Sequence, residues 1–132
     1  MEDLINKALG AVWPIICEPR QLLTPDETVG KSFSVVSANQ SSVHIVTEGG
    51  SPIQIQREAF LAALRYLAVH QHNQDNPCEI RSNQLAGDAG ELCQATRAVN
   101  SGTRVINYIV PMLATTGLVA FRGSKPNAVW LA

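Results

Sequence analysis

The sequence predicts an α+β fold, in which an N-terminal three-stranded antiparallel meander is followed by helices and a closing β-hairpin. Three patterns predict it. Short β-branched runs separated by polar turns occupy residues 33–56. Apolar residues then recur at helical spacing over residues 56–71. Near the C-terminus, apolar runs at 118–121 and 128–131 flank a loop that contains glycine and proline.

Composition places the chain among globular proteins. Hydrophobic residues make up 45% and charged residues 16% of its 132 residues, which argues against disorder and favours one compact domain. We expect a helix and the meander in residues 1–55 and the other elements in residues 56–132. No apolar run reaches the roughly 20 residues of a membrane-spanning helix, and the acidic N-terminus lacks the pattern of a signal peptide. A cytoplasmic location is therefore expected.

The N-terminal sub-region is expected to begin with a helix over residues 2–9, which Gly10 ends. Three prolines interrupt residues 12–29, so we expect that segment to wrap over the core without a long regular element. The strands of the meander follow at residues 33–36, 43–47 and 52–56. The edges of such a sheet are candidates for pairing with a second copy of the chain, which would give a homodimer.

The C-terminal sub-region is expected to hold three helices. The first covers residues 56–71 and precedes a short extended piece at 78–81. Ser82 is the expected N-cap of a second helix, which ends near residue 95 and is weakened by two glycines. Thr103 is the expected N-cap of a third helix that ends at residue 116, before Gly117. Pro111 leaves open whether this third helix is continuous or bent.

This order of helix, short strand, helix, helix and hairpin resembles the winged helix-turn-helix superfamily over about residues 56–132. The junction from Leu113 through Gly117 to Leu118 and Val119 resembles the step from the last helix to the first strand of the wing. By this resemblance, residues 103–116 would be the recognition helix and residues 122–127 the tip of the wing. The resemblance implies an α+β fold with a winged helix-turn-helix that binds double-stranded DNA.

The same resemblance implies which residues would contact DNA. The start of a recognition helix reads base edges in the major groove, and a wing lies near the phosphate backbone or the minor groove. Arg104 would pair with guanine and Asn107 with adenine, while hydroxyl groups and wing cations would meet phosphates. The predicted DNA-binding residues are Ser101, Thr103, Arg104, Asn107, Tyr108, Arg122, Ser124, Lys125 and Asn127.

Charge is unevenly distributed along the chain, in a way that fits a DNA-binding C-terminal half. Residues 1–79 contain nine acidic and five basic residues, whereas residues 80–132 contain two acidic and five basic ones. This excess is smaller than the clustered basic stripe of a strong nucleic-acid binder. Convergence of the five basic residues on one face would favour DNA binding, and their dispersal would favour a protein partner. They are Arg81, Arg97, Arg104, Arg122 and Lys125.

No set of residues with catalytic spacing emerges, so the sequence predicts no enzyme, no metal site and no cofactor. His70 and His72 are two positions apart and would point to different sides of a helix, which does not suit a shared metal. Widely spaced Cys17, Cys78 and Cys93 fit reduced structural thiols better than zinc ligands or disulfides.

We therefore hypothesise a DNA-binding winged-helix protein, either a small regulator or the targeting accessory of a DNA-processing or mobile-element system. The alternative is an adaptor that dimerises through the edge of the meander and docks protein partners on the winged module, because fold does not fix function. A further alternative is a small-molecule pocket near Trp13 and Phe60.

Overall fold

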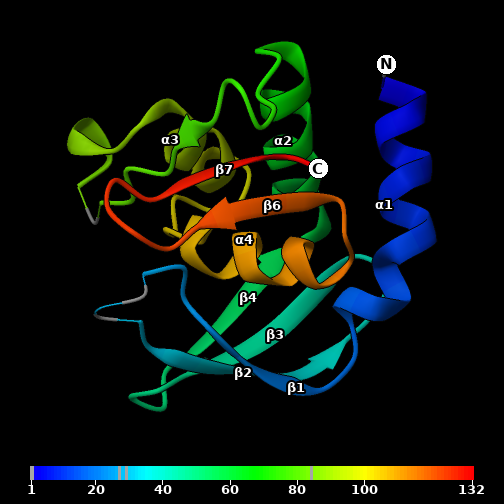
Figure 1. Ribbon diagram of the computed structural model, residues 1–132. Helices are drawn as coiled ribbons and strands as arrows, with labels where there is room; N and C mark the ends of the chain where they lie inside the picture. Colours follow the sequence, from blue (N-terminus) through cyan, green and yellow to red (C-terminus); the bar gives the residue numbers. More distant parts are fainter. Residues whose placement is uncertain (1, 27, 29, 84) are drawn as a thin grey trace.

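Two antiparallel sheets and four α-helices build the protein (Figure 1) in the computed structural model, which describes residues 2–26, 28, 30–83 and 85–132. The α+β class predicted from the sequence is confirmed. The first sheet has the strand order β1–β2–β3–β4, and the second has the order β5–β7–β6. None of the helices described is both long and apolar enough to cross a lipid bilayer.

The N-terminal meander has four strands where three were predicted. The expected strands are present as β2 (Ser32–Ala38), β3 (Ser42–Thr47) and β4 (Pro52–Gln56). They are preceded by β1 (Arg20–Leu23), which pairs antiparallel with β2 from Arg20 opposite Val35 to Leu23 opposite Ser32. Residues 12–29 were expected to contain no long regular element; this was wrong for residues 12–16, which belong to the helix α1 (Glu2–Ile16), and the short strand β1 was not predicted. Its four residues lie at the edge of the sheet without a fully buried side chain, so the sequence carries little strand signal there. Residues 27 and 29 of that segment lie outside the described chain.

The first helix, α1 (Glu2–Ile16), continues through Gly10 and Pro14, although Gly10 was expected to end it. Its buried face consists of Ile5, Leu9, Trp13 and Ile16, at the spacing of successive helical turns. Burial of these four apolar side chains outweighs the poor helix propensity of glycine and the backbone hydrogen bond that proline cannot donate.

The turn between β2 and β3 is organised by the side chain of Asn39. Its Oδ1 accepts hydrogen bonds from the backbone N–H groups of Ser41, at 2.8 Å, and Ser42, at 2.9 Å. Its backbone oxygen accepts a third from the indole Nε1 of Trp13, at 2.9 Å. The turn is thereby fixed locally and tied to α1 at the same residue.

The C-terminal elements follow the predicted order. Helix α2 (Arg57–Val69) is followed by the two-residue strand β5 (Cys78–Glu79). Two further helices, α3 (Glu91–Ala98) and α4 (Ile106–Thr115), precede the β-hairpin. The strands of the hairpin are β6 (Val119–Arg122) and β7 (Ala128–Leu131), as expected to within one residue. Because β7 pairs with both β5 and β6, it lies in the middle of the second sheet.

Both predicted helix caps in this half were wrong. Ser82 does not begin a helix, since the chain forms only a 3-10 turn at Ala86–Asp88 before α3 begins at Glu91; residue 84 lies outside the described chain. A Cβ atom on Gly90 would approach the Cβ of Arg81 to 2.9 Å, so this close passage requires glycine. Likewise α4 begins at Ile106 rather than after Thr103, and its N-cap position, Val105, makes no side-chain capping bond.

Helix α4 lies between the two sheets (Figure 1) and contacts α1, α2, α3, β1 and β6. It is continuous through Pro111, which answers the question that its sequence left open. Six of its ten residues are buried: Ile106, Ile109, Val110, Pro111, Met112 and Leu113. A proline is tolerated at this position because the surrounding core holds the helix on several sides.

A buried amide joins the two sub-regions. Asn100 follows α3 with 4% of its surface exposed, and its Nδ2 donates a hydrogen bond to the backbone oxygen of Gln54 at 3.1 Å. Its Oδ1 accepts one from the backbone N–H of Gln56 at 2.7 Å. The side chain thus pairs with the outer edge of β4 as a neighbouring strand would, and it satisfies two backbone groups that the sheet leaves open.

Replacement of Asn100 by alanine is expected to lower the free energy of unfolding by about 2–4 kcal/mol, because two buried backbone groups lose their partners. Urea-induced unfolding measures this change. Asn76→Ala is a matched control, since the side-chain amide of Asn76 is exposed and, among the residues described, bonds only to the backbone oxygen of Gln71; it should change stability by less than about 0.5 kcal/mol. Equal effects of the two substitutions would contradict the role given to Asn100.

Candidate functional site

A cleft of about 1190 Å³ opens on the described surface. Five segments line it: the β1–β2 loop, the β3–β4 turn, the segment after β5, the start of α4, and the loop between β6 and β7. Figure 1 shows these segments, which are far apart in the sequence, gathered on the left side of the molecule. The cleft therefore exists only because the first sheet and the C-terminal hairpin flank the same end of α4.

Five of the nine residues predicted to contact DNA line this cleft: Arg104, Asn107, Tyr108, Lys125 and Asn127. Asn107 and Tyr108 come from the first turn of α4 and Arg104 from the segment just before it, while Lys125 and Asn127 come from the hairpin loop. Arg104 is half-buried, and its side chain forms no hydrogen bond or ion pair with any other residue that the structure describes. Tyr108 is held in place by Phe33 of β2, with their ring centroids 5.1 Å apart in an edge-to-face arrangement.

The other four predicted residues do not line the cleft. Ser101 and Thr103 are exposed in the turn before α4, where Ser101 has a positive φ of 57°. Arg122 is exposed but bent back across its own hairpin, with Nε and Nη2 donating to the backbone oxygen of Pro126 at 3.2 and 2.9 Å. Ser124 is half-buried in the same loop. These four positions remain predictions outside the cleft.

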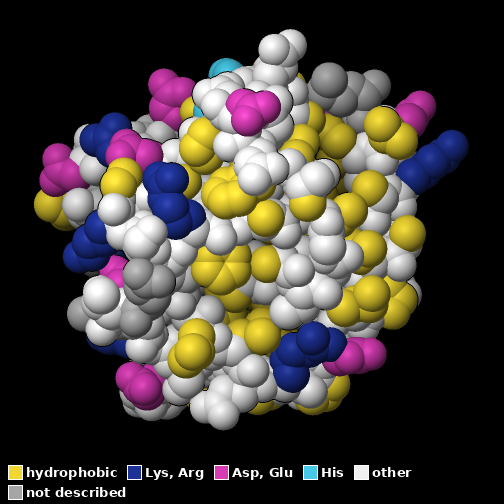
Figure 2. Space-filling model, viewed as in Figure 1, with side chains coloured by type: hydrophobic (Ala, Val, Ile, Leu, Met, Phe, Trp, Pro, Cys, Tyr) yellow, Lys and Arg dark blue, Asp and Glu magenta, His cyan; other side chains and the backbone are white. Residues whose placement is uncertain are grey.

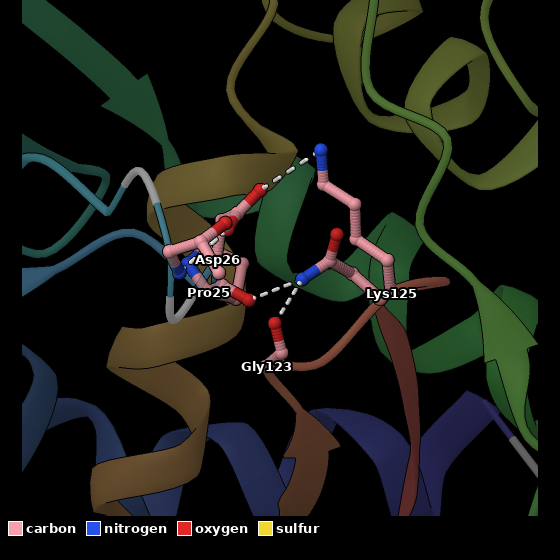
Figure 3. A network of polar contacts seen from close by, with 6 residues as sticks. Pro25, Asp26, Gly123 and Lys125 are labelled. Carbon is pink, nitrogen blue, oxygen red and sulfur yellow. Dashed lines mark hydrogen bonds and ion pairs between the residues drawn. The ribbon is translucent and has the colours of Figure 1, made fainter.

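The hairpin loop is attached to the β1–β2 loop across the mouth of the cleft (Figure 3). The Nδ2 of Asn127 donates to the backbone oxygens of Pro25, at 2.6 Å, and Gly123, at 2.9 Å. Beside it, Lys125 Nζ lies 4.0 Å from Asp26 Oδ2. Because the Asn127 amide nitrogen is already bonded twice to backbone, this residue positions the loop, and Lys125 is the hairpin side chain with a charge directed at the cleft.

The described charges of the cleft are mixed. The basic residues are Lys31, Arg81, Arg104 and Lys125, and the acidic ones are Asp26, Glu48 and Glu79. Figure 2 shows the same mixture on the left side of the molecule, where Lys and Arg side chains alternate with Asp and Glu. Basic residues thus exceed acidic ones by one. A broad positive field is absent from the described cleft, so an anionic ligand would be held by contacts with individual basic side chains.

Two arginines of the basic C-terminal half do not contribute to this cleft. Arg97 is buried, and its guanidinium donates to the backbone oxygen of Asn83. Arg122 is engaged by Pro126, as described above. Of the five basic residues whose convergence was in question, Arg81, Arg104 and Lys125 meet at the cleft. The convergence is therefore partial.

Sequence reasoning missed several cleft residues because folding alone brings them there. Asp26 and Lys31 belong to a segment that carried no motif, and Arg81 follows a strand of only two residues. Ser82 was expected to cap a helix; instead it lines the cleft, and its Oγ is buried with no hydrogen-bond partner among the residues described. No spacing rule links these positions to Arg104. Arg81 was identified from the sequence only as one of five basic residues that could converge, and its place in the cleft was not predicted.

The other sites considered from the sequence have local explanations. His70 and His72 lie beside Tyr66, with ring centroids 4.2 and 5.9 Å from it, and no group of three His, Cys, Asp or Glu side chains in the described chain is arranged to hold a metal. Trp13 and Phe60 are both buried and pack edge to face with ring centroids 5.4 Å apart, and neither lines the cleft described above.

The three cysteines are free thiols. Cys78 is buried in β5, and burial raises the pKa of its thiol to about 11. A thiol of that pKa remains protonated at neutral pH and is a poor nucleophile. The cleft is therefore the strongest candidate for a functional site in the described chain.

Comparison of the chain with protein-family models, with curated proteins and with solved structures yields no match. The function must therefore be inferred from the cleft itself, in which Arg104, without a partner in the described chain, three further cations and a tyrosine line a space large enough for a ligand.

Proposed function

We propose that this protein binds DNA, and that residues 56–132 form a winged helix-turn-helix whose contact surface is the cleft at the start of α4. The observation that carries the proposal is Arg104, a half-buried guanidinium that faces a cleft without a partner in the described chain. An arginine left in this state has five N–H donors available to a phosphate or to a guanine edge.

The arrangement of elements supports the winged-helix part of the proposal. Helices α2, α3 and α4 and the hairpin β6–β7 occur in the order of that superfamily, and the short strand β5 pairs with the returning strand β7. Gly117, with a φ of 83°, reverses the chain between α4 and β6. The hairpin loop, as the proposed wing, then lies beside the start of α4, where both can meet the same ligand.

The chemistry of the cleft suits a polyanion. Arg81 and Lys125 lie on the same cleft as Arg104, so phosphates along a strand can be met by more than one cation at a time. Each phosphate neutralised in this way releases condensed counterions, which makes binding weaken as salt is added. The proposed activity is binding without catalysis.

Substitution of Arg104 by alanine is expected to weaken binding to duplex DNA about three- to tenfold and to lower the slope of log K against log salt by about one. Lys125→Ala should act in the same direction. Fluorescence anisotropy with a labelled oligonucleotide, repeated between low and physiological salt, measures both quantities.

Arg65→Ala is the matched control, because it also removes one positive charge while Arg65 pairs with Glu2 at 2.7 Å and lies outside the cleft. It should leave the affinity within about twofold. If the wild-type protein binds no nucleic acid at low salt, the proposal is wrong; if all three variants weaken binding equally, the cleft is not the site.

Replacement of Asp26 by asparagine is expected to strengthen DNA binding about two- to fivefold at low salt, because a negative charge beside Lys125 is removed. The fold of the loop should persist, since the oxygen of asparagine can still accept from the N–H and hydroxyl of Thr28, as Asp26 Oδ1 does at 2.9 and 2.8 Å. Asp75→Asn, outside the cleft, should have no such effect. Unchanged affinity in D26N would show that Asp26 does not oppose the ligand.

A second candidate function is that of an adaptor that dimerises through the meander, and it is favoured by the open edge of β1. Asn100 covers the edge of β4, so β1 is the edge of that sheet available to a second copy. Leu23 is 62% exposed on β1, beside a groove of about 720 Å³ that Leu22, Pro111 and Phe121 also line. Exposed apolar residues along an open strand edge favour strand pairing between copies.

Substitution of Leu23 by lysine is expected to convert a dimer into a monomer, because charge on an edge strand opposes pairing. Sedimentation velocity over a range of protein concentrations measures the change. Leu4→Lys is the control, since Leu4 is 71% exposed on α1, away from the groove. A wild-type protein that stays monomeric throughout would exclude this mode of dimerisation.

A further inference from the structure

We propose that the cleft receives an unpaired nucleotide of a DNA strand, with its base against Tyr108 and its phosphates on Arg104 and Arg81. The inference rests on the proposed function and specifies its substrate: a single strand, or a duplex with a base displaced from the stack, in preference to an intact duplex.

The first argument is that α4 cannot be laid in a major groove along its length. A groove about 12 Å wide accepts a helix that projects from the protein surface. Here six of the ten residues of α4 are buried, β1 runs beside the helix, and Phe33 of β2 packs on Tyr108. The residues of α4 that remain accessible lie at its two ends, Asn107 and Tyr108 in the first turn and Ala114 and Thr115 in the last. The first turn faces a concave surface instead of projecting from a convex one.

The second argument is the composition of the cleft wall. A single strand is typically bound by cations that contact the backbone and by aromatic rings on which bases stack. Tyr108 supplies a ring that its contact with Phe33 holds in position. Arg104 and Arg81 supply cations, and Arg104 has no competing ion pair among the described residues.

The third argument is that polar groups in the wall are available to a base edge. Asn107 lines the cleft one residue before Tyr108, and its amide makes no hydrogen bond to another described residue. Ser82 Oγ is buried in the same wall, also without a partner in the described part of the chain. A displaced base exposes its Watson–Crick edge, which offers both donors and acceptors to such groups.

The size of the cleft is consistent with this ligand. Pockets that enclose drug-sized molecules have volumes of roughly 300–1,000 Å³. The cleft, at about 1190 Å³, has room for one nucleotide and part of the neighbouring backbone. Its width is bounded by the attachment of Asn127 to Pro25 at 2.6 Å, which joins two of its walls.

The experiment compares four probes with the full-length chain at one low salt concentration. They are a perfect duplex, the same duplex with one extrahelical 2-aminopurine, the corresponding single strand, and free deoxyadenosine monophosphate. We expect the extrahelical and single-stranded probes to bind at least about tenfold more tightly than the perfect duplex, as one base–aromatic contact would give. Quenching of 2-aminopurine fluorescence on binding would report stacking directly.

Variants at Tyr108 test the role of the ring. Tyr108→Leu is expected to reduce the preference for unpaired probes over the perfect duplex about tenfold and to abolish the quenching of 2-aminopurine. Tyr108→Phe, which keeps the aromatic ring, should retain both the preference and the quenching. Thermal unfolding identifies any loss of fold caused by removing the contact with Phe33. If Tyr108→Leu does not fold, Asn107→Ala, which alters the proposed base-edge contact alone, is expected to reduce the preference.

The outcomes separate this inference from the proposed function. Equal affinity for perfect duplex and unpaired probes would overturn the inference and leave DNA binding intact. No binding of any DNA probe at low salt would overturn both. If the free mononucleotide binds as tightly as the single strand, the ligand of the cleft is a mononucleotide and the proposed DNA strand is wrong.

Discussion

The buried side chain of Asn100 is the interaction on which the arrangement of the two sub-regions depends. Its amide pairs with the backbone of Gln54 and Gln56, while its own backbone holds the turn after α3, accepting from the Thr103 N–H at 3.1 Å and donating to the Arg97 oxygen at 3.0 Å. One residue thus fixes both the edge of the first sheet and the path of the chain into α4. Because Arg104 follows four residues later, the same contact sets where the cleft cation lies relative to the first sheet.

Local patterns predicted the elements that carry a clear signal in their own residues. Helix α2 has apolar residues at helical spacing, strands β2 to β4 have short β-branched or alternating runs between polar turns, and the hairpin β6–β7 has two apolar runs around a loop with glycine and proline; the positions of these elements were confirmed. Prediction failed where tertiary contacts outweighed local preference. Helix α1 passes Gly10 because Trp13 and Ile16 reach the core beyond it, and Ser82 lies in a cleft wall because Gly90 allows Arg81 to pass closely.

The candidate site was predictable only on one side. Arg104, Asn107 and Tyr108 follow from the helix order, and Lys125 from the hairpin loop. The opposite wall, with Asp26, Lys31 and Arg81, is assembled by pairing between segments distant in sequence, for which residue spacing gives no information. That wall also brings the carboxylates. These carboxylates weaken the general attraction of the cleft for polyanions. Selectivity for a ligand would therefore depend on simultaneous contacts with its phosphate and its base, and less on net charge.

The hydrogen bond between Asn127 and Pro25 joins residues 102 positions apart in the sequence. A contact of this range closes a loop that includes nearly the whole domain, and its entropic cost is offset only when the elements between have already packed. The cleft is consequently a late product of folding. During synthesis the first sheet can form while α4 and the hairpin are still within the ribosome, and the cleft is incomplete until the loop between β6 and β7 has emerged.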